Sequence, residues 1–199
     1  MFKFNIFFTT FVLSAAVLAA QPFESINYKI FNQNPPPLEH IGYVKTYQSG
    51  QVDAQRWSIG YECVDRGYAK YSESGSYIGQ LGVGHARIQS GWARTEQKKG
   101  KYEYAWLDEI VDGIVSQNVT PWISLGYGNP IYSSEITLGA KIFTDEPTLK
   151  AWEKYVETTV SRYKDRVHKW EVWNEPNQKI NKDNPSTYTT LLVRTCEAI

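Results

Sequence analysis

Residues 169–177 hold the side chains of this sequence that are best suited to chemistry, in the run Lys-Trp-Glu-Val-Trp-Asn-Glu-Pro-Asn. The tryptophan and valine residues favour a buried β-strand, and Pro176 cannot continue a central strand. The strand therefore delivers a carboxamide, Asn174, and a carboxylate, Glu175, to its C-terminal end. Active sites of parallel α/β folds lie at that end of the strands. We expect Glu175 to be buried there, in a setting that suits a general acid.

The alternative for Glu175 is a surface glutamate held by a backbone N–H or an arginine, which is the commoner case for a lone glutamate. The aromatic residues around it and the adjacent Asn174 favour a site instead. A sugar site needs an aromatic face for the ring, an amide for a hydroxyl group and a carboxyl group that moves a proton. Strict alternation along a strand points Asn174 and Glu175 to opposite faces. Both can serve one site only if the strand kinks or bulges at its tip.

Residues 170–177 resemble the fourth-strand motif of clan A retaining glycoside hydrolases, and glycoside hydrolase family 39, the β-xylosidase and iduronidase group, has the nearest pattern. Further segments resemble the second strand and helix of that group: residues 86–92 (Ala-Arg-Ile-Gln-Ser-Gly-Trp), 95–96 (Thr-Glu), 100–102 (Gly-Lys-Tyr) and 106–108 (Trp-Leu-Asp). The resemblance covers residues 57–199. It implies a (β/α)8 TIM barrel, of which this chain holds about the first half, and hydrolysis of β-linked saccharides, with xylosides first.

The resemblance also assigns roles to residues. Retaining hydrolysis uses two carboxyl groups about 5–5.5 Å apart. Glu175 would be the acid/base, and Asn174 would bond the sugar 2-hydroxyl. The nucleophile of the family is a glutamate on the seventh strand, which would lie beyond Ile199. Without that strand, the 199-residue chain alone is expected to be inactive.

Four further residues are candidates for contact with the substrate. In clan A enzymes an arginine at the place of Arg87 braces the nucleophile, whereas the structural alternative is an ion pair of Arg87 with an acidic residue such as Glu171 or Glu62. Trp92, Tyr127 and Asn129 follow predicted strands, where loops meet substrate, although packing in the core or a loop explains them equally well. The residues after the third strand depart from the histidine-bearing pattern of the best-known xylosidases, which leaves the sugar open.

Strand and helix patterns alternate along the chain, which predicts a parallel sheet. We expect strands at 57–61, 83–89, 120–125 and 166–174. We expect helices at 68–81, from Trp106, after a cap at Thr144 or Asp145, and from about residues 184–185, the last burying residues such as Leu191 and Cys196. Four strand–helix units are half of a barrel of about 250 residues, so we expect the N-terminal part of a longer protein. The alternative is a smaller, complete open α/β sheet.

Residues 1–20 have the features of a secretory signal peptide: Lys3, a following apolar run, and small residues around Ala19 and Ala20. A retained membrane anchor is the alternative. Residues 21–56 are then an N-terminal arm and residues 57–199 the barrel domain. We predict a secreted protein, extracellular or periplasmic.

The composition narrows the partners. The chain has 21 basic and 21 acidic residues, so neither nucleic acid nor an anionic membrane is a predicted partner. Aromatic residues make up 15% of the chain, which suits an aromatic core, a carbohydrate cleft, or both. No spacing of Cys or His indicates a metal site, and no cofactor is predicted. The pairing of Cys63 with Cys196 and the oligomeric state are left open. An oligosaccharide or polysaccharide is the predicted partner.

Other functions remain as alternatives. A non-catalytic carbohydrate-binding protein, or an inactive remnant, would keep the aromatic residues without turnover. Within the same class, the enzyme could be another clan A glucanase or mannanase. A redox role for Cys63 and Cys196 is disfavoured because neither lies in a C-x-x-C arrangement.

Overall fold

The computed structural model describes residues 39, 41–42, 45–53, 56–133, 141–178 and 185–199. It divides into two units, Met1–Tyr47 and Gln48–Ile199, and the second contains every strand and helix discussed below. The predicted signal peptide and most of the predicted arm lie outside the described residues. Within the described residues, no helix is both long and apolar enough to cross a membrane.

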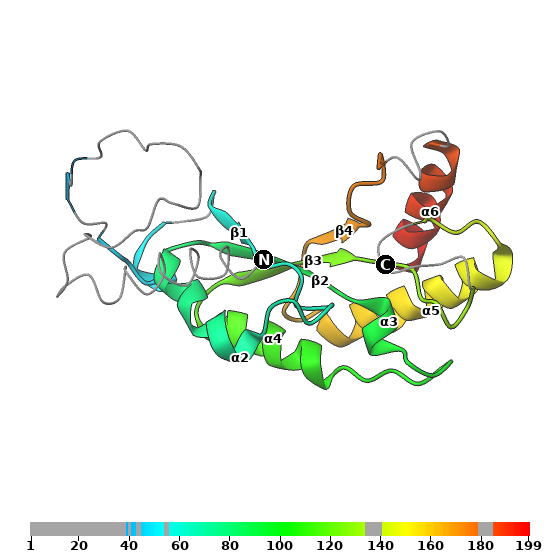
Figure 1. Cartoon of the computed structure of the whole chain (residues 1–199), viewed down its shortest axis with the longest axis horizontal. Coiled ribbons are helices and arrows are strands. Elements are labelled where there is room, and N and C mark those ends of the chain that lie inside the picture. Colours follow the sequence, from blue (N-terminus) through cyan, green and yellow to red (C-terminus); the bar gives the residue numbers. More distant parts are fainter. Residues whose placement is uncertain (1–38, 40, 43–44, 54–55, 134–140, 179–184) are drawn as a thin grey trace. The chain divides into compact units, whose positions relative to one another are not determined.

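Four strands form one parallel sheet in chain order, with helical segments between them (Figure 1). The strands are β1 (Ser58–Gly60), β2 (His85–Gln89), β3 (Thr120–Leu125) and β4 (Trp170–Val172). Each strand pairs in parallel with the next. The alternation of strand and helix with parallel pairing confirms the predicted α/β architecture.

The register divides the sheet into an apolar and a polar face, because paired residues of neighbouring strands share a face. On the apolar face Ile88 pairs with Ile123, which pairs with Trp170. On the polar face the rows are Gly60–Arg87–Trp122 and Gln89–Ser124–Glu171. The second polar row lies near the carboxyl ends of the strands, where the sequence predicts the candidate site.

Two long helices cover the apolar face. In α4 (Ala105–Ser116) the buried residues Leu107, Ile110, Val111 and Ile114 follow helical spacing. In α5 (Glu146–Tyr163) the buried row runs from Leu149 to Tyr163 and includes Trp152 and Tyr155. The side chain of Asp145 accepts a hydrogen bond of 3.0 Å from the backbone N–H of Thr148, so Asp145, the second of the two predicted caps, begins α5.

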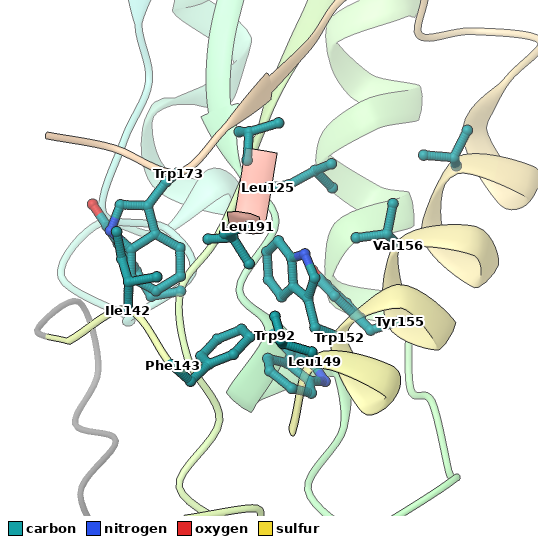
Figure 2. Packing of buried hydrophobic residues seen from close by; sticks show 13 residues of the cluster. Trp92, Leu125, Ile142, Phe143, Leu149, Trp152, Tyr155, Val156, Trp173 and Leu191 are labelled. Carbon is teal, nitrogen blue, oxygen red and sulfur yellow. The ribbon is translucent and has the colours of Figure 1, made fainter. Parts of the chain in front are cut away.

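Many aromatic residues pack into one core cluster, which includes residues of β3 and α5 (Figure 2). Trp92 has no exposed surface and stacks on Tyr155, with ring centroids 5.6 Å apart. The indole of Trp152 meets that of Trp92 at 5.5 Å and donates a hydrogen bond of 2.7 Å to Thr195 of α6 (Pro185–Ala198). Of the two readings of the aromatic content, the heavily aromatic core is therefore present.

The predicted helix over 68–81 is only partly correct. It is the short α2 (Tyr71–Ser74) followed by a 3-10 helix, η3 (Gly75–Leu81). The side chain of Tyr71 occupies the space over Gly75 and Gly113, where an added Cβ would lie 2.4 Å from its ring and 2.1 Å from its hydroxyl oxygen. The two glycines therefore allow the close packing of Tyr71 between the first helical segment and α4.

Two other expectations need correction, and the open question of the cysteine pairing is answered. The fourth strand is shorter than predicted, because the backbone N–H of Val167 still bonds the carbonyl of Tyr163 at the end of α5. In α6 Leu191 and Thr195 are buried, whereas Cys196 is exposed. Cys63 and Cys196 are both free thiols, so no disulfide joins them.

Candidate active site

Arg87 lies on the polar face and joins β2 to β4 and to the segments that follow β1 and β4. Its side chain is 13% exposed and donates to both carboxylate oxygens of Glu171, at 2.9 and 2.5 Å. It also donates to Glu62, which follows β1, and, at 3.0 Å, to the side-chain oxygen of Asn174. The bonds to Glu171 are the main reason that the pKa of Arg87 is raised. Both acidic partners of the structural alternative are therefore present, and the same guanidinium reaches Asn174.

The backbone of β4 bends sharply after its last residue, Val172. Trp173 and Glu175 both have positive φ angles, 67° and 50°, which is unusual for residues other than glycine. The neighbouring strand holds this bend, since Ser124 donates to the carbonyl of Trp173 at 2.9 Å and the Trp173 N–H donates to the carbonyl of Leu125 at 2.8 Å. The predicted kink at the strand tip is thus present. Backbone strain of this kind costs on the order of 1–3 kcal/mol per residue and concentrates at functional sites.

Glu175 follows this bend and is exposed, so the expectation that it is buried is wrong for the described residues. The chain has left the sheet by this point and enters a turn, in which the Gln178 N–H donates to the Glu175 carbonyl at 3.0 Å. The side-chain amide of Gln178 also donates to the Glu175 carboxylate. Glu175 is thus exposed at the carboxyl edge of the sheet, with the Gln178 side chain as the partner of its carboxylate within the described residues.

Tyr127 joins the same group of side chains from the end of β3. It is 5% exposed, and its ring meets that of Trp173 edge to face at 5.4 Å. Its hydroxyl accepts a hydrogen bond of 2.9 Å from Gln89 and interacts with the side chain of Asn174. Burial raises the pKa of Tyr127, and the positive charge of Arg66 and these hydrogen bonds oppose the rise.

Trp92 and Asn129 are both buried, Trp92 in the core and Asn129 in the loop after β3. Trp92 is fully buried, and its indole N–H donates to Glu96 at 2.6 Å. Asn129 is 1% exposed, and its amide donates to the Glu96 carbonyl at 2.8 Å. For both residues the packing alternative describes the structure. They hold the loops that follow β2 and β3, and Arg87, Asn174 and Tyr127 are the predicted residues that the fold brings together.

Four residues of this edge were not singled out by sequence reasoning. Gln89 is the last residue of β2, and Arg66 donates to its side-chain oxygen at 2.6 Å. Asp65 is a buried carboxylate whose Oδ1 lies 3.4 Å from Nε of Arg66, although neither atom forms a hydrogen bond. Glu171 was named only as an ion-pair partner. Gln89 could have been identified from its position, because it is the last residue of a strand within the motif segment 86–92.

No group of three or more His, Cys, Asp or Glu side chains suited to a metal ion occurs among the described residues. The side chains described at this edge include the Glu175 carboxyl group, the amides of Gln89 and Asn174, the Tyr127 phenol and the guanidinium groups of Arg66 and Arg87.

Solved structures that resemble this chain include glycoside hydrolases. A family 39 β-xylosidase from Caulobacter crescentus matches 74% of this chain and 38% of its own, with a TM-score of 0.56 and 23% identity. A family 39 glycoside hydrolase from Bacteroides cellulosilyticus matches 70% of this chain and 28% of its own (TM-score 0.55, 23% identity). An exo-beta-1,4-mannosidase from an Opitutaceae bacterium matches 71% and 29% (TM-score 0.57, 15% identity). The described sheet and helices therefore have the fold of the first half of a (β/α)8 barrel.

Sequence comparison finds relatives of the same kind, while no family model matches the chain. An aryl-phospho-beta-D-glucosidase of Bacillus subtilis is 24% identical over 140 residues, which are 67% of this chain and 28% of that protein. A cytosolic beta-glucosidase of Cavia porcellus is 27% identical over 115 residues, which are 55% of this chain and 24% of that protein. The chain spans less than a third of the length of these two relatives.

Proposed function

We propose that the protein hydrolyses β-linked glycosides by a retaining mechanism, with Glu175 as the acid/base. The observation that carries this proposal is the meeting of Arg87, Asn174 and Tyr127 at the carboxyl ends of parallel strands, directly beside the kinked tip that presents Glu175. Asn174 is partly exposed and held by Arg87, so its amide can bond a sugar hydroxyl while the neighbouring carboxyl group moves a proton.

The proposed reaction begins with protonation of the leaving oxygen by Glu175. A second carboxylate attacks the sugar carbon, and Glu175 then activates the water that releases the sugar. The family resemblance puts that second carboxylate on a seventh strand, whereas the described sheet has four strands. Arg87 would brace it in the complete site. We therefore expect the 199-residue chain by itself to show no turnover.

Xylosides are the substrates that we propose first, because the resemblance is nearest to family 39 and one structural neighbour is a β-xylosidase of that family. Glucosides and mannosides are the alternatives within the class. We also propose that the protein is exported, on the basis of residues 1–20, and that it acts on oligosaccharides or polysaccharides outside the cell or in the periplasm.

The direct test is hydrolysis of aryl β-xylosides, β-glucosides and β-mannosides by the protein in its full natural length. The variant Glu175→Gln should lose activity, whereas Glu197→Gln, the same change at an exposed position of α6, should keep it. Proton NMR of the first sugar released should show the β-anomer, because retention follows from a two-step mechanism. Binding of xylo-oligosaccharides without turnover would instead support the carbohydrate-binding alternative.

A further inference from the structure

Arginine side chains only donate hydrogen bonds. At this site two arginines, Arg66 and Arg87, stand at the two ends of one network of hydrogen bonds. Arg66 donates to Gln89 at 2.6 Å, and Gln89 donates in turn to the Tyr127 hydroxyl at 2.9 Å. Because Arg66 has no acceptor, Gln89 must turn its oxygen toward Arg66 and its amide N–H toward Tyr127. The orientation of the Gln89 amide is thus fixed by its partner.

The same logic applies on the other side of Tyr127. Arg87 donates to the side-chain oxygen of Asn174 at 3.0 Å, and, against the rise caused by burial, the Asn174 side chain lowers the pKa of Tyr127, as a donor to its hydroxyl does. The Tyr127 oxygen therefore accepts a hydrogen bond from the Gln89 N–H group, and the Asn174 side chain lies close enough to influence the Tyr127 pKa. The Gln89 N–H group cannot accept the Tyr127 proton, and among the described residues the Tyr127 hydroxyl donates to no other side chain.

The packing of the ring keeps this hydroxyl in place. The guanidinium of Arg66 lies over the face of Tyr127 at 5.4 Å, and the Trp173 ring meets it at 5.4 Å. Asn174 is partly exposed, and the side chain of Arg66 is 23% exposed. The ring cannot easily swing away to find another acceptor for its proton.

We propose that Arg66 and Gln89 are positioning residues that commit the Tyr127 O–H group to donate a hydrogen bond to an oxygen atom of the bound sugar. This proposal rests on the proposed function, since it concerns the sugar subsite beside Asn174. Gln89 acts only through Tyr127. The site would therefore require a hydrogen-bond acceptor at one position of the sugar. A substrate that lacks the hydroxyl group at this position would lose the contact.

The variant Gln89→Glu reverses the direction of the hydrogen bond between residue 89 and Tyr127 while keeping the size of the side chain. A carboxylate at this position accepts from Arg66 and also accepts the Tyr127 proton, which is then withdrawn from the sugar. In the full-length protein, Gln89→Glu and Tyr127→Phe should each lower kcat/KM about tenfold on the best aryl glycoside. The double variant should lose no more than either single one. Gln97→Glu, the same charge change at an exposed position, should match the wild type.

Two further measurements separate the parts of the proposal. Against a series of single-deoxy glycosides, Tyr127→Phe should have no effect on the analogue that lacks the partner hydroxyl. NMR titration of the protein labelled at the tyrosine ring carbons should show the Tyr127 pKa higher in Gln89→Glu than in the wild type, because a carboxylate that accepts the proton stabilises the phenol. This titration needs no activity.

The outcomes are distinct. A Gln89→Glu variant with wild-type kcat/KM, or losses that multiply in the double variant, would overturn the positioning role. Equal losses of Tyr127→Phe on every deoxy analogue would overturn the sugar contact. An unchanged or lower Tyr127 pKa in Gln89→Glu would overturn the proposed direction of the hydrogen bonds from Arg66 through Gln89 to Tyr127. A full-length wild type that hydrolyses no glycoside would refute the proposed function and the sugar contact, while the titration would still decide that direction.

Discussion

Arg87 on β2 and Asn174 after β4 are 87 residues apart in the chain and share a hydrogen bond of 3.0 Å across the polar face of the sheet. The bond crosses β3, which lies between the two strands. Glu171 and Glu62 hold the same guanidinium from two further directions. The orientation of the Asn174 amide is therefore set by an arginine that is itself held at both ends.

Replacement of Arg87 should test how much of the fold depends on this arrangement. Arg87→Met leaves two carboxylates without their partner, and since these groups are partly exposed we expect a loss of about 1–2 kcal/mol in the free energy of unfolding. Arg87→Lys should recover only part of it, because lysine cannot form the two-pronged contact with Glu171. Denaturant unfolding measures both. Arg162→Met, which breaks the more exposed pair with Asp108, is the control with a smaller effect.

Glu96 is a fully buried carboxylate that we expect to be a larger determinant of stability. It accepts hydrogen bonds from the Trp92 indole at 2.6 Å, the Tyr132 hydroxyl at 2.5 Å and the Gly100 N–H at 2.6 Å. Glu96→Ala leaves these donors unsatisfied in the core and should cost about 2–4 kcal/mol. Glu103→Ala, at a nearby exposed position, should be close to neutral. Equal unfolding midpoints for the two variants would contradict the role of Glu96 as a buried anchor.

His85 should make the protein sensitive to mild acid. It is 8% exposed, and its Nε2 lies 3.0 Å from the ammonium nitrogen of Lys169, which can only donate. Burial and, secondarily, the Lys169 charge lower the pKa of His85 in the folded state. The unfolded state therefore binds the proton more readily. The stabilisation is complete above the unfolded pKa of about 6.5 and is lost as the pH falls below it.

The variant His85→Gln isolates this contribution, because glutamine can accept from Lys169 but does not titrate. Denaturant midpoints from pH 8 to 5 should fall more steeply for the wild type than for the variant. Other groups, such as Asp65 with its raised pKa and Asp108 with its lowered pKa, titrate in both proteins and cancel in the difference. Parallel curves would show that His85 protonation is not coupled to folding.

The parallel sheet and the main helices could be predicted from the sequence because their signals are local. The apolar row of α4 and the Asp145 cap of α5 are periodic or positional patterns that do not depend on distant residues. The residues 86–92 and 170–177 also placed Arg87 and Asn174 at the same edge. The number and order of the strands followed from the alternation alone.

Burial at the strand ends could not be predicted in the same way. Trp92 and Asn129 follow strands as substrate-binding residues do, yet partners distant in sequence, Tyr155 for Trp92 and Glu96 for Asn129, draw them into the core or a loop. Conversely, Glu175 is exposed at a strand tip where Trp173 and Glu175 both adopt positive φ angles, which the propensities of these residues do not indicate. The role of Gln89 depends on Arg66, which lies in another loop.

Export is tested by the N-terminus of the mature protein. If residues 1–20 are a cleaved signal peptide, Edman or mass-spectrometric sequencing of the protein from its natural source should begin at about Gln21, or at Ala20. An intact Met1 on the cell-bound or secreted protein would refute cleavage and favour the retained anchor.

The rate of Glu175→Gln on substrates with different leaving groups tests the central claim most directly. Glutamine keeps the size of the side chain but cannot exchange a proton, so hydrolysis of a natural disaccharide should fall about 10²–10⁴-fold in the full-length protein. An aryl glycoside with an activated phenolate departs without protonation, so its first step should suffer far less. Azide attacks the glycosyl-enzyme intermediate without a general base, so it should restore turnover of the aryl glycoside by the variant. Equal losses on both substrates without rescue by azide would show that Glu175 is a structural carboxylate.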